Sequence, residues 1–100
     1  MARRNYIEYR EWRELVYNRD NYTCQVCSSR GGITINAHHL FSFNENELLR
    51  TELDNGVTLC EECHNMFHGF YGYRGNTKAQ FDEFKELFAV GALNASNTAQ

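Results

Sequence analysis

Residues 54–68 read DNGVTLCEECHNMFH, and this segment predicts a turn, a strand and a helix in succession. Asp54-Asn55-Gly56 is typical of a turn, and Val57-Thr58-Leu59 is a short apolar run with β-branched residues, which predicts a strand. The glutamates that follow favour the positive end of a helix dipole, so we expect a helix over residues 61–68 that Gly69 ends. The segment therefore predicts a strand joined directly to a helix, with cysteines at the junction and histidines on the helix.

A second strand is expected earlier in the chain. Residues 33–38, ITINAH, alternate apolar with polar side chains and are rich in β-branched residues, as a half-buried strand is. The serines and glycines of residues 28–32 predict a turn before it. Residues 40–54 lack a sustained period and are expected to form a long connection, with a helical turn near residues 47–50. Together these segments predict a β-hairpin with a wide loop, followed by a helix.

A further helix is predicted on each side of this unit. Asn5 and Glu8 have capping-box spacing at the start of a helix over residues 6–18. In this helix the residues that recur at helical spacing are Trp12, Leu15, Val16 and Arg19. Thr77 and Gln80 make a second capping box, before a helix that Gly91 is expected to end. The inward stripe of that helix is expected to comprise Phe81, Phe84, Leu87 and Phe88.

The composition is that of one small domain. The chain has 100 residues, of which 42% are hydrophobic and 14% aromatic, so a disordered chain is excluded. No apolar run approaches the ~20 residues that span a membrane, and residues 1–7 lack the apolar stretch of a secretory signal. We expect an intracellular protein with a single domain over residues 1–90, a core over about 12–84 and a flexible tail over 91–100.

Four cysteines form two close pairs that predict a structural zinc site. Cys24 and Cys27 make one Cys-x-x-Cys turn, and Cys60 and Cys63 make the other. Each turn presents two sulfurs to one ion, and two turns complete the tetrahedral shell of Zn²⁺ with no open position. Redox or incidental buried cysteines are the alternative. The 32 residues between Cys27 and Cys60 exceed the ~15–20 of a common zinc ribbon, so the hairpin is an insertion between the two turns.

All four histidines of the chain fall on this hairpin or on the helix after it. His64 and His68 are four residues apart on the predicted helix, so they share one face and can bind one cation together. A third ligand from the strand, His38 or His39, would complete three imidazoles and leave open positions for water and phosphate. Ordinary polar side chains at coincidental spacing are the alternative.

These residues resemble a known family. Ala37-His38-His39-Leu40, the segment 54–60, and Cys63-His64 with His68 are similar to the HNH endonucleases over roughly residues 12–84. The resemblance implies an α+β fold of the small ββα-metal (His-Me finger) type with a four-cysteine structural zinc. It implies metal-dependent hydrolysis of DNA phosphodiester bonds, with His39 as the general base and Asn55 bracing its loop. The catalytic divalent metal is then bound by His38, His64 and His68. A single domain of 100 residues with one such site is expected to nick DNA or to cut it with weak specificity.

The identity of that catalytic metal is open between Mg²⁺, Mn²⁺, Ni²⁺ and Zn²⁺. Many members of the family have Asp where this chain has His38, so the site is richer in nitrogen and its preference shifts toward softer transition ions. Adjacent strand residues face opposite sides of a sheet, so His38 and His39 can share one site only if the strand bends or bulges there. We predict such an irregularity.

The partner that the resemblance implies is DNA. The net charge of -3 is unfavourable for a broad phosphate-binding surface, and two bound divalent ions on four thiolates would leave it unchanged, so any DNA footprint must be local. The candidate contacts are Arg74, Lys78 and Arg30, with solvated surface charge as the alternative for each. Arg74 comes first, because residues 71–77, YGYRGNT, resemble a segment common in phage-type members.

Several functions remain open at this level. Phage packaging, homing, restriction and toxin nucleases share these residues, so a phage packaging protein or another DNA-processing protein is a conceivable partner, in a bacterial or phage-infected cytoplasm. The chain could act as a monomer or a dimer, and no membrane partner is expected. The main alternative is a non-catalytic zinc module that binds DNA or protein, with the histidines incidental. A zinc hydrolase of another substrate has no pocket signature in its favour.

Overall fold

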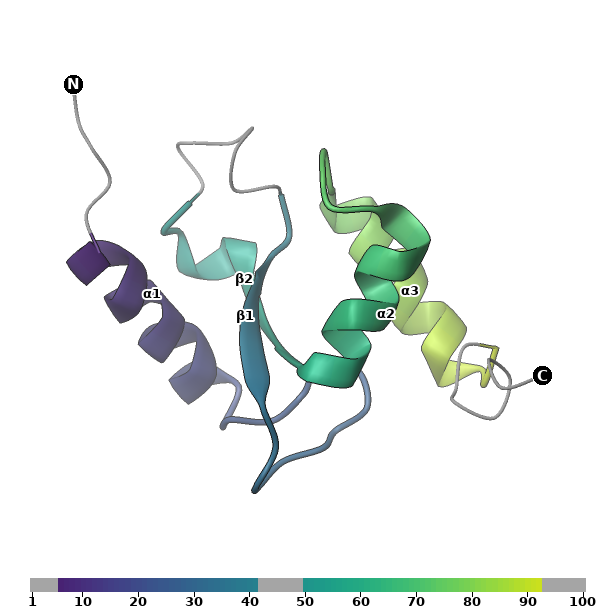
Figure 1. Ribbon diagram of the computed structural model, residues 1–100, viewed down its shortest axis with the longest axis horizontal. Coiled ribbons are helices and arrows are strands. Elements are labelled where there is room, and N and C mark those ends of the chain that lie inside the picture. The colour runs from purple at the N-terminus through teal and green to yellow at the C-terminus, as the bar shows by residue number, and fades with distance from the viewer. Residues whose placement is uncertain (1–5, 42–49, 93–100) are drawn as a thin grey trace.

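The computed structural model describes residues 6–41 and 50–92, which form three α-helices and a two-stranded sheet (Figure 1). In chain order the elements are α1 (Tyr6–Arg19), β1 (Ile35–His39), the 3₁₀ turn η2 (Leu53–Asn55), β2 (Gly56–Cys60), α2 (Glu61–Tyr71) and α3 (Lys78–Ala89). The predicted α+β architecture is confirmed, with a hairpin that leads directly into a helix. No helix within the described ranges is long and apolar enough to cross a membrane.

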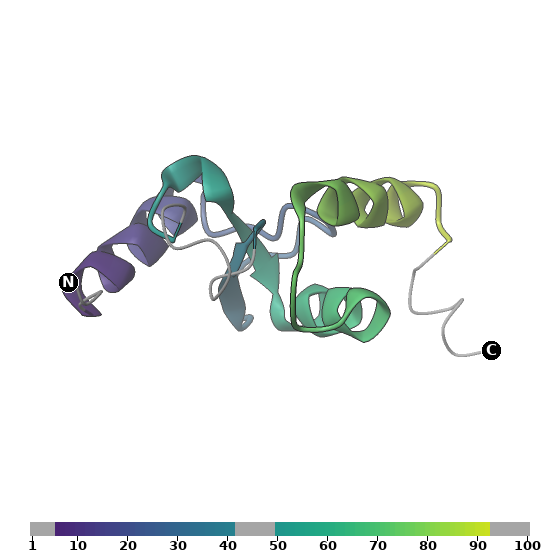
Figure 2. The same cartoon turned by 90° about the horizontal axis from the view of Figure 1, so that it is seen from above.

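The sheet separates two small cores. β1 and β2 are antiparallel in a continuous register that runs from Ile35 opposite Cys60 to His39 opposite Gly56. α1 lies on one side of this sheet, and α2 and α3 lie on the other (Figures 1 and 2). Successive side chains of a strand point to opposite faces, so β2, which is buried throughout, contributes to both cores.

The larger core lies between the sheet and the two C-terminal helices. Its fully buried apolar side chains are Leu59, Phe67 and Phe84, each 0% exposed. Phe67 meets Phe84 edge to face with their ring centroids 5.5 Å apart. The sequence-predicted stripe of α3 is largely confirmed, since Phe81 is also buried and Phe88 packs against this core. Leu87, however, is 36% exposed, because it lies beyond the edge of the helix face that meets α2.

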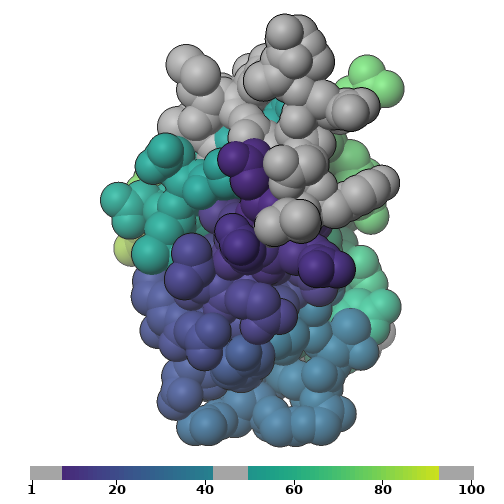
Figure 3. Space-filling model, turned by 90° about the vertical axis from the view of Figure 1, so that its left-hand side faces the viewer, coloured from purple at the N-terminus to yellow at the C-terminus, as the bar shows by residue number. Residues whose placement is uncertain are grey.

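The smaller core is made by α1 and β2. Trp12 and Val16 are buried against the strand, and Thr58 Oγ1 donates a hydrogen bond to the Val16 carbonyl at 3.4 Å. A Cβ on Gly56 would lie 2.5 Å from Val16 Cγ2 and 2.6 Å from Trp12 Cζ2, so only glycine fits there. Leu15 is 56% exposed, since the buried stripe of α1 runs through Trp12 and Val16 instead. Figure 3 shows this side of the molecule, with α1 in purple across its middle.

The ends of the helices depart from the sequence predictions in one respect. α3 begins with the predicted capping box, in which Thr77 Oγ1 accepts from Gln80 N at 3.2 Å and Gln80 Oε1 accepts from Thr77 N at 3.1 Å. α2 was expected to end at Gly69 but continues to Tyr71. Gly72 ends it, because its φ of +79° lies in the region that favours glycine and its N–H donates to the His68 carbonyl.

Three of the predicted features lie outside the described residues. They are the Asn5 cap, most of the helical turn near residues 47–50, and nearly all of the tail over 91–100.

Candidate active site

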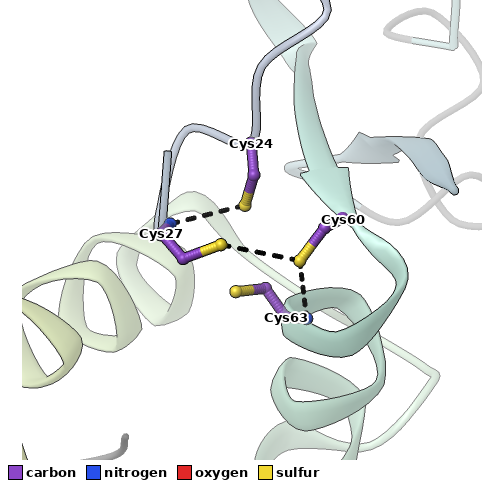
Figure 4. A group of neighbouring side chains, drawn as sticks. All are labelled: Cys24, Cys27, Cys60 and Cys63. Carbon is purple, nitrogen blue, oxygen red and sulfur yellow. Dashed lines mark hydrogen bonds between the residues drawn. The ribbon is translucent and has the colours of Figure 1, made fainter. Parts of the chain in front are cut away.

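The four cysteines converge from two separate parts of the chain (Figure 4). All four sulfurs lie within 4.8 Å of one another, and Cys27 Sγ is 3.7 Å from Cys60 Sγ. Four sulfurs bound ~2.3 Å from a tetrahedral zinc ion would stand about 3.8 Å apart. Backbone N–H groups donate to two of them, from Cys27 to Cys24 Sγ and from Cys63 to Cys60 Sγ, each at 3.4 Å. The cluster is consistent with a zinc site, as the paired spacing predicts.

The protonation of this cluster also favours a cation. A hydrogen bond from the Cys63 thiol lowers the pKa of Cys24 to about 4, and the backbone N–H groups around it act in the same direction. The pKa of Cys63 is raised well above its ordinary value, first by that hydrogen bond to Cys24 and then by burial. Burial likewise raises the pKa of Cys60. Four crowded sulfurs thus cannot all ionise without a positive charge between them, and a divalent ion supplies that charge.

Three histidines form a second cluster on the α2 side of the sheet. His38 comes from β1, while His64 and His68 come from successive turns of α2, and one ring nitrogen of each lies within 4.8 Å of the others. His64 Nε2 and His68 Nε2 are 3.2 Å apart. Nitrogens bound ~2.1 Å from a common ion would stand about 3.0–3.4 Å apart, depending on the coordination angle.

His38 provides the test of whether a metal fits this second cluster. The residue is 3% exposed, and its Nε2 has no hydrogen-bond partner among the described residues. A buried polar atom without a partner costs about 1–3 kcal/mol, so such an atom calls for an explanation. A cation held between His38, His64 and His68 would satisfy it, and the three neutral imidazoles are suitable donors for a transition ion.

The same burial keeps the cluster unprotonated. Burial, followed by the charges of His64 and His68, lowers the pKa of His38 to about 3. Burial, followed by the charge of His68, lowers the pKa of His64 to about 4. Both imidazoles are therefore neutral at pH 7, and each has a nitrogen lone pair that can coordinate a metal.

His39 faces the other side of the sheet, toward α1. Its ring stacks on Trp12 with the centroids 4.1 Å apart, and its Nε2 donates to the Arg50 carbonyl at 2.9 Å. Burial lowers its pKa. The predicted bend or bulge is wrong, because the pairing of β1 with β2 continues through both histidines. His38 and His39 meet instead at the rim of one open pocket of about 350 Å³, which runs along the outer edge of β1 between α1 and α2.

Asn55 lies at the base of the wide hairpin loop. It is 5% exposed, its Oδ1 accepts from Phe41 N at 2.9 Å, and its Nδ2 donates to the Phe41 carbonyl at 3.3 Å. Its own carbonyl accepts from Leu40 N at 2.9 Å. These bonds join the two ends of the loop directly after His39.

The cations selected from the sequence lie outside the pocket. Arg30, Arg74 and Lys78 are exposed, none of them lines it, and Lys78 pairs with Asp82 at 2.9 Å. The pocket contains Arg13 instead, whose guanidinium carbon lies 5.9 Å over the ring of Tyr9 and 5.8 Å over that of Tyr17. Sequence reasoning missed this residue, although a spacing of four residues on either side of Arg13 places all three side chains on one face of α1.

Comparison with known proteins covers the same residues. Residues 24–70 match a family model described as HNH endonuclease, and this range contains both cysteine pairs, all four histidines and Asn55. The chain is 31% identical over 68 residues to Anaredoxin from Nostoc sp. (strain PCC 7120 / SAG 25.82 / UTEX 2576), an alignment that covers 68% of this chain and 86% of that protein. No solved structure matches the chain.

Proposed function

This chain belongs to the HNH endonuclease family, and on that premise we propose that it is a metal-dependent nuclease that hydrolyses phosphodiester bonds of DNA. The observation that carries the proposal is the convergence of His38, His64 and His68 around a buried nitrogen that has no other partner in the described part of the chain. Three histidines on the wall of an open pocket can bind a metal ion at a place that a substrate can reach.

His38, His64 and His68 would hold the catalytic ion. When bound, it supplies positive charge to a phosphate oxygen and to the departing 3′ oxygen. The imidazoles keep the site in place, since His38 is fixed in the sheet and the other two stand on one face of α2. The cysteine cluster anchors the first turn of the same helix, because Cys63 directly precedes His64.

His39 is the proposed general base. Because a carbonyl oxygen can only accept, the bond to Arg50 places the proton of the neutral ring on Nε2 and leaves the lone pair on Nδ1. The lowered pKa keeps the ring neutral near pH 7, so Nδ1 can take a proton from the attacking water. The stacked Trp12 ring fixes the plane of the imidazole, and Asn55 fixes the loop behind it.

Arg13 is the proposed phosphate contact on the opposite wall. Its guanidinium has no ion pair within residues 6–41 and 50–92 and is held between two tyrosine rings instead. The net charge of the protein is negative, so an arginine of this kind that lines the pocket suits this pocket to an anionic ligand such as a phosphate. The hydrogen bond with Tyr17 raises its pKa further, so it stays charged.

Plasmid nicking tests the function directly. The zinc-loaded protein should convert supercoiled plasmid to the open-circular form with Mg²⁺, Mn²⁺ or Ni²⁺, and EDTA should stop the reaction. His39→Ala should lose at least about 100-fold in rate, since general-base catalysis contributes roughly 10²–10⁴-fold. The variant should retain its zinc and its circular dichroism spectrum. Nicking by His39→Ala at the wild-type rate would refute the assignment of the base.

Two other functions give different results in the same assay. A non-catalytic zinc module would bind DNA or protein without cutting under any metal. The name of the Nostoc relative is of a redox type, so dithiol chemistry at Cys24–Cys27 or Cys60–Cys63 is the other candidate. The four sulfurs lie together as one group, which favours metal binding over two independent dithiols. Protein whose four cysteines bind no zinc and are oxidised reversibly to disulfides by a disulfide reagent would favour the redox function.

A further inference from the structure

We propose that Gly72 and Asn76 position His68 for metal binding, with the Gly72 carbonyl as acceptor and Asn76 as the residue that holds this carbonyl in place. The inference rests on the proposed metal site of His38, His64 and His68, and it adds two residues from the turn between α2 and α3 that the sequence analysis did not select.

The proton of the neutral His68 ring lies on the nitrogen that faces Gly72. Its Nδ1 lies 2.7 Å from the Gly72 carbonyl oxygen, and a carbonyl oxygen only accepts hydrogen bonds. Nδ1 therefore carries the ring proton, and Nε2 carries the lone pair. This Nε2 is the atom that lies 3.2 Å from His64 Nε2, within the cluster. The bond to Gly72 thus selects the nitrogen that points at the metal site and fixes the ring plane.

Gly72 has a backbone conformation that other residues rarely adopt. Its φ of +79° and ψ of -178° fall in a region that is essentially restricted to glycine. A Cβ at this position would meet no atom within 4 Å, so space does not explain the glycine. The backbone angles do, because they allow the Gly72 N–H to end α2 on the His68 carbonyl while the Gly72 carbonyl turns back toward the His68 ring.

Asn76 links the Gly72 carbonyl to the start of α3. This polar residue is 4% exposed, and its Nδ2 donates to the Gly72 carbonyl and to Gln80 Oε1, both at 3.2 Å. Gln80 Oε1 also accepts from Thr77 N in the capping box of α3. The Gly72 carbonyl is thereby tied to the rigid start of α3. A position for His68 that depended on the end of α2 alone would be less well defined.

A metal titration distinguishes this role from a purely structural one. The protein is first loaded with one equivalent of zinc, and Ni²⁺ is then titrated by calorimetry, with His64→Ala as the baseline for a disrupted second site. Asn76→Ala and the milder Asn76→Ser should weaken Ni²⁺ binding by about 10- to 100-fold. The matched control is Tyr71→Phe, which removes the 2.6 Å bond from Tyr71 at the end of α2 to Glu83 of α3 and should leave Ni²⁺ affinity unchanged.

The tautomer of His68 provides a readout that a structural role would not change. In the metal-free histidine site, ¹⁵N NMR of the imidazole should find the proton on Nδ1 in the wild type and in Tyr71→Phe. In the Asn76 variants the population with the proton on Nε2 should increase. Gly72→Ala should lose the Nδ1–H tautomer and Ni²⁺ affinity together.

The outcomes separate this inference from the nuclease function. Ni²⁺ affinity within about threefold of wild type in both Asn76 variants, or a wild-type His68 protonated on Nε2, would overturn it. A wild type that binds no ion besides zinc would overturn the inference and the metal site together. A wild type that shows the affinity and tautomer effects but leaves plasmid intact would refute the nuclease and support the roles of Gly72 and Asn76.

Discussion

At His38, a polar side chain is buried in a way that folding alone does not explain. The residue is 3% exposed, and the Phe67 ring lies edge to face against it with the ring centroids 4.7 Å apart. Its Nε2 has no hydrogen-bond partner within the described residues. An apolar side chain of similar size would fill this position without the desolvation cost of the nitrogen. The histidine therefore lowers the stability of the metal-free protein, a cost that its proposed role as a ligand of the second metal explains.

The acid sensitivity of folding follows from this burial. The pKa of His38 is about 3 in the folded protein and ~6.5 in the unfolded chain, so between these values the unfolded state binds the proton and stability falls as the pH falls. From pH 7.5 to 5.5 the wild type should lose about 1.4 kcal/mol more free energy of unfolding than His38→Leu. Urea unfolding of both proteins with one equivalent of zinc measures this, and equal losses would contradict the burial of His38. His38→Leu should also lose Ni²⁺ binding.

Gly56 shows how closely α1 approaches the sheet. Gly56→Ala would place a Cβ 2.5 Å from Val16 Cγ2, and overpacking of this kind should lower the free energy of unfolding by about 1–3 kcal/mol. Gly69→Ala is the matched control, because Gly69 is inside α2 and a Cβ there would meet nothing within 4 Å. That change should raise stability by about 0.5–1 kcal/mol. Effects of the same sign in urea unfolding would contradict this account.

At the scale of the elements, the features that were predictable depend on residues close in sequence. The Thr77–Gln80 capping box and the strand that runs into Cys60 are local patterns, and both are present. The end of α2 was mispredicted, because a glycine inside a helix and a glycine that ends it differ in φ, which neighbouring residues do not reveal. The opposed faces of His38 and His39 follow from the regular alternation of a strand, and the bend was predicted wrongly because both histidines line one pocket at the strand edge without it. The place of Arg13 in that pocket depends on how α1 packs against the sheet, a contact between distant parts of the chain.

The two cysteine turns come from parts of the chain that are distant in sequence. Cys24 and Cys27 lie in the connection after α1, while Cys60 and Cys63 lie where β2 meets α2. Cys60→Ala should therefore abolish cooperative folding, since structural zinc contributes roughly 10 kcal/mol or more to small domains. Zinc content and circular dichroism measure the loss, with His39→Ala as a control that should retain both. A folded, zinc-free Cys60→Ala protein would show that the apolar cores suffice.

At the scale of the whole molecule, the charge and the proposed substrate are opposed. The net charge is -3, so DNA binding cannot come from a generally basic surface. What the fold provides instead is a pocket along the outer edge of β1, with imidazoles on the α2 wall and Arg13 on the α1 wall. A local footprint of this kind predicts weak binding with a small salt dependence, to which each phosphate contact makes a measurable contribution.

Substitution of Arg13 is the most direct test of this local footprint. In a His39→Ala background, which prevents cleavage, Arg13→Gln should weaken binding to duplex DNA and reduce the slope of log K against log salt by about one unit. Arg10→Gln is the matched control, because it removes the same charge from α1, but at an exposed position that does not line this pocket. Net charge changes equally in both variants, so only the position of the arginine differs. Equal losses in the two variants, measured by fluorescence anisotropy over a salt series, would show that the field of the whole protein rather than this pocket governs DNA binding.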